Sequence, residues 1–170
     1  AGSLGLPCDV SQAAQLQSVF DSCIETFGKV DILINNAGHA MAGEFESITD
    51  EQWQYDFDLK LMAAVRMSRL VFPGMKERRW GRIINIASIT VREPLNYLAL
   101  SNSMRSALVS WGKSLAIDIA KDNITLNSIL SGYFDTERLA KLCTQKAAKL
   151  NVPVEQVRAE MEAQVPMQGI

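Results

Sequence analysis

The chain has 170 residues, of which 48% are apolar and 21% charged, an ordinary globular composition with enough length for one buried core. A net charge of −2, and the lack of any apolar run near the roughly 20 residues that span a bilayer, give no reason to expect nucleic acid or a membrane as a partner. The three cysteines are scattered and lack metal-ligand spacing, which predicts reduced thiols in a cytoplasmic protein and no metal site.

The first third of the chain predicts a helix followed by a buried strand. Apolar residues fall on one helical face over Ser11–Phe27, where Ser11 can cap the start and Gly28 ends the helix. The continuous apolar run Val30–Ile34 is typical of a strand in a parallel sheet that is covered on both faces.

The rest of the chain continues this alternation. Thr49 is expected to cap a long helix over Glu51–Arg78, bent at Pro73-Gly74, before a second strand at Gly81–Ala87. The alternation predicts an α/β fold with a doubly wound parallel sheet flanked by helices. The remaining elements are a long helix, a third strand and a helical segment interrupted near Pro153, over Asn96–Lys121, Ile124–Ile129 and Thr136–Gln164.

Polar residues gather at the predicted carboxyl ends of the strands, where doubly wound sheets bind their ligands. Each group also has a structural interpretation, because Gly38 can serve a turn and Ser88 can cap a helix. Their occurrence at successive strand ends favours a functional cleft. The groups are Cys8-Asp9-Val10, Asn36-Ala37-Gly38-His39, Ala87-Ser88 and Ser131-Gly132.

These motifs resemble the short-chain dehydrogenase/reductase family, in the subgroup of 3-oxoacyl-carrier-protein reductases and their relatives. Phe27–Gly38 is similar to the central family motif, and Gly81–Ser88 resembles the strand that delivers the catalytic serine. Asp9-Val10-Ser11 resembles the strand end whose Asp meets the adenine, and Ile124–Gly132 the strand that ends in Pro-Gly. The resemblance implies one partial domain of Rossmann type over residues 1–170.

The family's activity implies hydride transfer between NAD or NADP and a small carbonyl or alcohol substrate, possibly a 3-oxoacyl compound, with Ser88 holding the carbonyl oxygen. Which of the two nucleotides is used stays open. Relatives also imply a homodimer or homotetramer built through the two long helices, with close contact at Ala63-Ala64 and Ala107-Leu108. The cofactor-binding residues implied are Asp9, Val10, Asn36, Ala37, Gly38, Ile86, Gly132, Phe134 and Thr136.

The catalytic set departs from the family pattern. The family pairs a Tyr with a Lys four residues later, and these positions align with Leu98 and Asn102, while the family's Asn aligns with Lys60. Tyr97, about 100° round a helix from the expected place, can supply the proton or can be a half-buried tyrosine at a helix start. Lys60 can supply the missing cation from the facing helix or can be a surface lysine. Ser88, Tyr97 and Lys60 are therefore the candidate catalytic residues.

Two further side chains have competing interpretations. His39 can shuttle a proton at the mouth of the cleft or can be a solvated loop histidine. Arg105, one turn beyond Asn102, is expected to be an interface residue.

The resemblance also implies missing parts. The family's first two strands and its glycine-rich phosphate loop are expected before Ala1, and its last strand after Ile170. Because that loop binds the pyrophosphate, these 170 residues alone are expected to bind NAD(P) weakly. The alternative function is a catalytically degenerate pseudo-enzyme that acts as a binding or oligomer-partner protein. An intact glycine-rich loop encoded upstream would favour the enzyme.

Overall fold

The computed structural model of the protein describes residues 2–39, 41, 43 and 45–166. The chain divides into two compact units, Ala1–Ser131 and Gly132–Ile170. The first unit contains the sheet, and the second contains two helices. That the whole chain is one partial domain stays a prediction.

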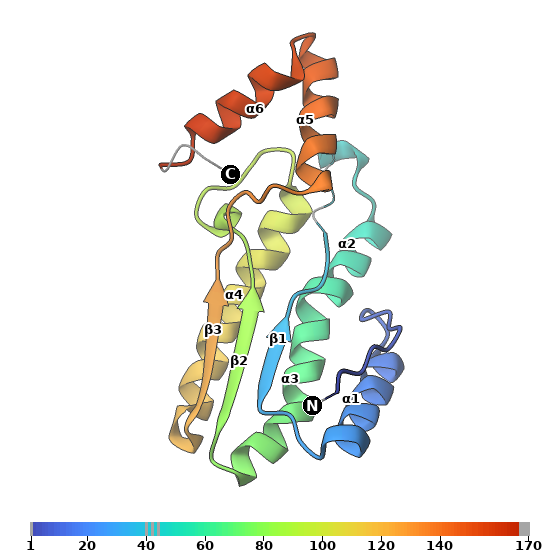
Figure 1. Ribbon diagram of the computed structural model, residues 1–170, viewed down its shortest axis with the longest axis vertical. Helices are drawn as coiled ribbons and strands as arrows, with labels where there is room; N and C mark the ends of the chain where they lie inside the picture. Colours follow the sequence, from blue (N-terminus) through green and yellow to red (C-terminus); the bar gives the residue numbers. More distant parts are fainter. Residues whose placement is uncertain (1, 40, 42, 44, 167–170) are drawn as a thin grey trace. The chain divides into compact units, whose positions relative to one another are not determined.

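Three parallel strands form the sheet, in the order β1-β2-β3 (Figure 1). They are β1 (Ile32–Asn35), β2 (Gly81–Ile86) and β3 (Ile124–Ile129). The α/β fold with a parallel sheet and flanking helices is confirmed. The third strand coincides with its predicted bounds, and the other two agree within one or two residues, because their β-branched side chains suit a pleated, buried surface.

Two helices of the first unit, α3 (Ala63–Glu77) and α4 (Ala99–Ile119), pack against the sheet (Figure 1). Leu33, Ile83 and Leu126 occupy matching positions of the three strands and form the core with Val71 and Met75. The helices of this unit are α1 (Ala13–Phe27), α2 (Asp50–Phe57), α3 and α4, with short 3-10 turns at Phe45–Ser47, Ile89–Val91 and Ala120–Asp122.

The other face of the sheet is open among the residues that the structure describes. Ile32 and Ile34 of β1 are 54% and 58% exposed, whereas Leu33 between them is buried. The expectation that this strand is covered on both faces is therefore met on one face only, because alternate strand residues point to opposite faces and the helices cover one of them.

The ends of α1 and α2 depend on different capping residues. Gly28 adopts the left-handed conformation (φ 77°) and ends α1 as predicted. The expected cap at Ser11 is wrong, because its hydroxyl donates to Asp9 Oδ1 at 2.7 Å and Gln12 stands at the N-cap position. Thr49 caps α2 as predicted, in a capping box with Gln52.

The long second helix is interrupted at a different place from the one predicted. A π-helical turn, Asp58–Met62, separates α2 from α3, and Pro73 lies inside α3, which continues to Glu77. A π-turn adds a residue to the turn, so the residues after it face directions that a continuous α-helix would not give them. Leu59 and Lys60, within this turn, are both buried.

Three of the four residues predicted to form the oligomer contacts are buried within the chain itself, and the fourth, Ala107, is half-buried. Ala63, Ala64 and Leu108 are 6%, 2% and 2% exposed, so these three residues cannot form the predicted helix contacts with a second copy. Ala63 and Ala64 are covered because they belong to α3, which packs against α1 and β1. The exposed large apolar residues of the long helices are Tyr55 and Ile117.

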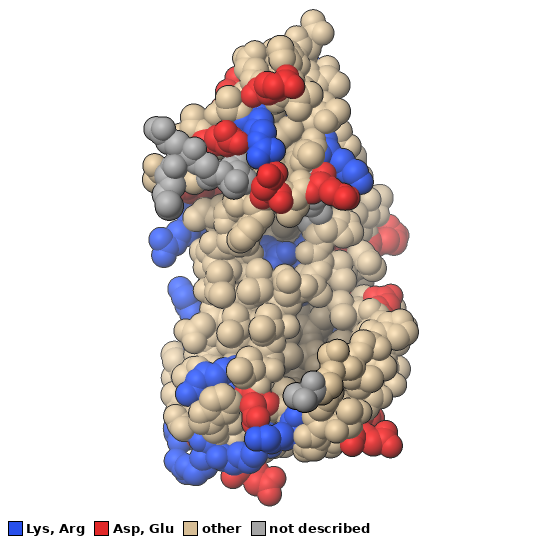
Figure 2. All heavy atoms as spheres, viewed as in Figure 1, with Lys and Arg blue, Asp and Glu red and all other residues tan. Residues whose placement is uncertain are grey.

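Basic side chains gather at the lower end of the view in Figure 2, and Figure 1 shows the amino-terminal ends of the strands at that end. Arg78, Arg79 and Arg82 each donate a hydrogen bond to the backbone carbonyl of another segment. Arg82 also stacks on the ring of Trp80, 4.6 Å from its centroid. These cations therefore fasten the loops that connect the helices and strands.

The second unit is a helical hairpin of α5 (Glu137–Leu150) and α6 (Val154–Ala163). The Thr136 hydroxyl caps α5 by accepting from the Leu139 N–H, and the predicted interruption at Pro153 is confirmed. Its core consists of Leu139, Cys143, Ala147, Val157 and Met161. None of the helices in the described part of the chain is long and apolar enough to cross a membrane.

Candidate functional site

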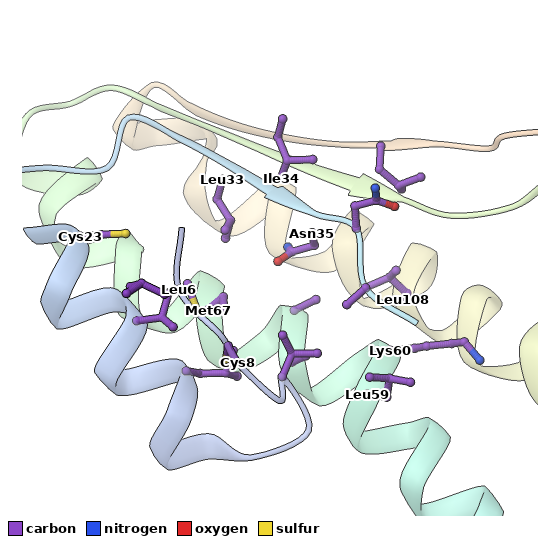
Figure 3. Close-up of a pocket in the computed structure, with 18 of the residues that line it drawn as sticks. Leu6, Cys8, Cys23, Leu33, Ile34, Asn35, Leu59, Lys60, Met67 and Leu108 are labelled. Atoms are coloured by element: carbon purple, nitrogen blue, oxygen red, sulfur yellow. The ribbon is translucent and has the colours of Figure 1, made fainter. Parts of the chain in front are cut away.

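A cavity of about 370 Å³ lies along the free edge of β1 (Figure 3). Leu6 and Cys8 of the extended amino-terminal segment line one side, and the buried face of the helices lines the floor. At the end where β1 and β2 terminate, the lining becomes polar. The residues there are Asn35, Asn36, Ala37, Lys60, Ile86 and Arg105.

Gly38 follows β1 in the left-handed conformation (φ 86°), as its predicted turn role requires. A Cβ at this position would lie 2.8 Å from Lys60 Cγ and 3.3 Å from Leu59 Cγ. Both the backbone conformation and the close approach of the π-turn therefore require glycine at the end of β1.

Lys60 is buried at 3% exposure and forms an ion pair with Asp56, whose side chain is also fully buried. The interpretation of Lys60 as a surface lysine is therefore wrong. The π-turn places its methylene stem against Gly38, and in Figure 3 its nitrogen points away from Leu6 and Cys8. Asp56 Oδ2 has no hydrogen-bond partner among the described residues.

Arg105 extends from α4 to the ends of both neighbouring strands. Its Nη2 donates to the Gly38 carbonyl at 3.0 Å, and its Nη1 donates to the Ile86 carbonyl. These bonds give the part-buried guanidinium a role within the chain, and its expected role at an interface stays a prediction. Burial lowers the pKa of Arg105 from its ordinary value, and the negative charge of Asp56 opposes this shift.

Ser88 follows β2 and caps the 3-10 turn Ile89–Val91, so its structural interpretation is confirmed. Its Oγ accepts from the Thr90 N–H at 3.2 Å and from the Thr90 hydroxyl at 3.1 Å. The backbone bond uses the Ser88 oxygen as acceptor, and two hydroxyls can hydrogen-bond in either direction, so the Ser88 hydrogen can be directed to Thr90 or to a ligand.

The start of α4 holds the residues at the positions of the family's tyrosine and lysine. Leu98 is the N-cap residue, and Tyr97 before it is half-buried, with its carbonyl accepting from the Gly43 N–H. The Asn102 amide donates to the Leu95 carbonyl at 2.8 Å, which ties the loop to the helix. Neither Leu98 nor Asn102 carries a charge or an acidic proton.

Comparison with known proteins decides the family. A profile of the family described as short chain dehydrogenase matches residues 2–147. The chain belongs to this family.

Among its curated relatives, D-beta-hydroxybutyrate dehydrogenase of Cupriavidus necator is 32% identical over 90% of the chain and 59% of its own length. The 3-oxoacyl-(acyl-carrier-protein) reductase FabG of Escherichia coli is 31% identical over 87% of the chain and 61% of its own length. The solved L-sorbose reductase from Gluconobacter frateurii, complexed with NADPH and L-sorbose, superposes with a TM-score of 0.87 at 33% identity and covers 95% of the chain. The chain spans about three fifths of the lengths of these relatives, including 62% of the L-sorbose reductase.

The cavity of this short chain dehydrogenase brings together some of the residues that were predicted to bind the cofactor. The cavity is lined by Val10, Asn36, Ala37 and Ile86, and Gly38 is the next residue in the sequence after Ala37. Asp9 is exposed and accepts hydrogen bonds from the Ser11 N–H and hydroxyl. Ser88, Tyr97 and Asp9 are not among the residues that line it in the described part of the chain. His39 is exposed, as its loop interpretation predicts.

The other predicted cofactor residues of this short chain dehydrogenase belong to the second unit. Phe134 is 64% exposed within it, a Cβ at Gly132 would meet open space, and Thr136 serves as the α5 cap. Sequence reasoning missed Asp56 and the role of Arg105 within the chain. Asp56 carried a usable signal, since it stands one helical turn before Lys60.

Proposed function

We propose that the protein carrying this chain is an NAD(P)-dependent oxidoreductase that acts on a small carbonyl or alcohol substrate, with 3-oxoacyl compounds as the first class to test. Family membership supports the reaction class. The names of two relatives, a hydroxybutyrate dehydrogenase and a 3-oxoacyl reductase, support the substrate class. The observation that carries the proposal is the convergence of Asn36, Ala37 and Ile86 at one end of the cavity.

The nucleotide would lie across the carboxyl ends of β1 and β2, where ligands of doubly wound sheets bind. The residues fit such a group, because Ala37 and Ile86 offer a small apolar surface and Asn36 places a polar side chain beside them. The bound nicotinamide would supply or accept the hydride. On the family resemblance, the complete set is Asp9, Val10, Asn36, Ala37, Gly38, Ile86, Gly132, Phe134 and Thr136.

The chain's own residues would handle the proton and the developing charge. Ser88 would donate its hydroxyl hydrogen to the carbonyl oxygen of the substrate, and so stabilise negative charge there, while its oxygen accepts from the Thr90 N–H. Tyr97 would supply the proton in place of the residue at position 98. Lys60 of the π-turn is the candidate cation for the ionised phenol, and it would act on the phenol only when its buried pair with Asp56 opens.

The test is oxidation of NADH and NADPH, in the presence of an acetoacetyl thioester, by a longer protein that contains this chain. Turnover with at least one nucleotide is expected. Ser88→Ala should lower it by about 10²-fold, as for loss of one oxyanion donor. Ser18→Ala, an exposed serine of α1, is the matched control and should leave the rate unchanged.

Binding of a nucleotide without turnover would instead favour the pseudo-enzyme, which Leu98 and Asn102 make a real alternative. If neither nucleotide binds to the chain, nor to a longer protein that contains it, the proposal fails.

A homodimer or homotetramer through α3 and α4, and a cytoplasmic location, are part of the same proposal.

A further inference from the structure

Two cationic side chains from different helices converge on Gly38. Arg105 of α4 donates to its carbonyl, and the stem of Lys60 in the π-turn packs against its Cα. Asp56 is paired with Lys60, and its charge also acts on Arg105. One carboxylate therefore faces two cations below the ends of β1 and β2.

We infer that Arg105 is a positioning residue that clasps the ends of β1 and β2 and so shapes the cofactor cleft. Its two terminal nitrogens bond the carbonyls of Gly38 and Ile86, which are 48 residues apart in sequence. The planar guanidinium presents several donors in a rigid fork, so one side chain can hold two carbonyls at once. A lysine in the same place would act as a single point charge.

A role in packing alone does not explain why position 105 holds an arginine whose side chain is partly buried. Arg105 Nε is buried without a hydrogen-bond partner among the described residues, and removing a guanidinium from water is unfavourable. An apolar side chain at position 105 would fill the same space without that desolvation. The guanidinium is therefore retained for the two carbonyls and for its permanent positive charge.

The ligand that this charge suits is the anionic dinucleotide of the proposed function, on which this part of the inference rests. Asn102, at the position of the family's lysine, is neutral. Arg105 follows one turn later on the same helix and lines the cavity beside Asn36 and Ile86. It thus keeps a cation at the strand ends, although at a different position on α4.

Amide hydrogen exchange followed by mass spectrometry tests the clasp without any ligand. In Arg105→Met, exchange in the segments 33–39 and 84–88 should accelerate about tenfold or more, the effect of losing charged hydrogen bonds. Exchange in α1 should stay unchanged. Arg105→Lys should protect one segment only, and Arg69→Met, which removes an exposed arginine of α3, is the control. No local change, or a rise along the whole chain, would overturn the inference.

The dissociation constants of NADH and NADPH, measured by fluorescence, test the consequence for the cleft. Arg105→Met should weaken binding about tenfold. The control variant Arg69→Met should unfold at the same temperature as the wild type. If a longer protein that contains this chain binds neither nucleotide but the two segments still respond in Arg105→Met, the proposed function fails and the clasp stands. If binding is unchanged in Arg105→Met, the role in the cleft is overturned.

Discussion

The Asp56 carboxylate and the Lys60 ammonium form an ion pair in which both side chains are fully buried, one helical turn apart at the start of the π-turn. Asp56→Asn would leave two cations below the strand ends without their carboxylate. We expect this substitution to lower the free energy of unfolding by about 3–5 kcal/mol, as for other buried pairs that lose one partner. Urea denaturation measures it, with Asp118→Asn, an exposed acid of α4, as the control. A change below about 1 kcal/mol would mean that the pair is not formed.

Gly38 provides a second test, of the close approach between the π-turn and β1. Gly38→Ala would place a methyl group 2.8 Å from Lys60 Cγ in a left-handed backbone conformation. The backbone strain alone is about 1–2 kcal/mol, so the midpoint of urea denaturation should fall clearly. Gly5→Ala meets open space and should leave the midpoint unchanged. Equal midpoints for both variants would contradict the placement of Lys60.

The missing pair on α4 gives a prediction about chemistry. Restoring Leu98→Tyr together with Asn102→Lys should raise ketone reduction by at least about tenfold, since positioned acid catalysis contributes about 10²–10⁴-fold. The gain is measured as kcat/KM with an acetoacetyl thioester. Asn102→Lys alone is the control, because it also loses the hydrogen bond to Leu95. No gain, together with a large loss in Tyr97→Phe, would show that the proton comes from Tyr97.

The start of α2 is expected to respond to acid. The pKa of Glu51 is lowered from its ordinary value of 4.5, chiefly by the nearby Thr49 side chain. A lowered pKa in the folded state means that the stabilisation is present above pH 4.5 and is lost as the pH falls through the folded-state pKa. Thr49→Val should raise the pKa of Glu51 in an NMR titration, and Thr125→Val should not. An unchanged value in Thr49→Val would refute this contact.

The proposed oligomer can be tested at an exposed residue of α4. Ile117 is 79% exposed, an unusual fraction for a large apolar side chain on a long helix. Ile117→Asp should shift the sedimentation coefficient to that of a monomer, whereas Lys113→Asp, one turn earlier, should shift it less. A wild-type chain that sediments as a monomer would speak against the proposal for this chain.

The strands and most helix ends were predictable because each depends on local chemistry. The run Ile124–Ile129 begins with alternating buried and exposed positions and contains three β-branched residues, and Gly28 and Thr49 are the residue types that end and cap helices. The burial of Lys60 was not predictable, because a periodicity of 3.6 residues assumes an uninterrupted α-helix and the π-turn changes its phase.

The role of Arg105 within the chain was missed for a different reason. A single arginine among Ala, Leu and Ser predicts the exposed side of a helix, and its partners lie far away in the sequence. Only the parallel pairing of β1 with β2 brings the carbonyls of Gly38 and Ile86 within reach of one side chain. The two roles of Ser88 were easier to predict. Its place after a β-branched strand indicated both a cap and a hydroxyl group at the end of the strand.

The π-turn at Asp58–Met62 makes this helix sensitive to length as well as to side-chain identity. Deleting one residue there would convert the turn to regular α-helix and rotate α2 against α3 by about 100°. Lys60 would then move away from Gly38. In addition, α3 could no longer face β1 while α2 faces α4. Segments exchanged with relatives must therefore keep the residue count between Thr49 and Gly81, even where every side chain in contact with the cleft is preserved.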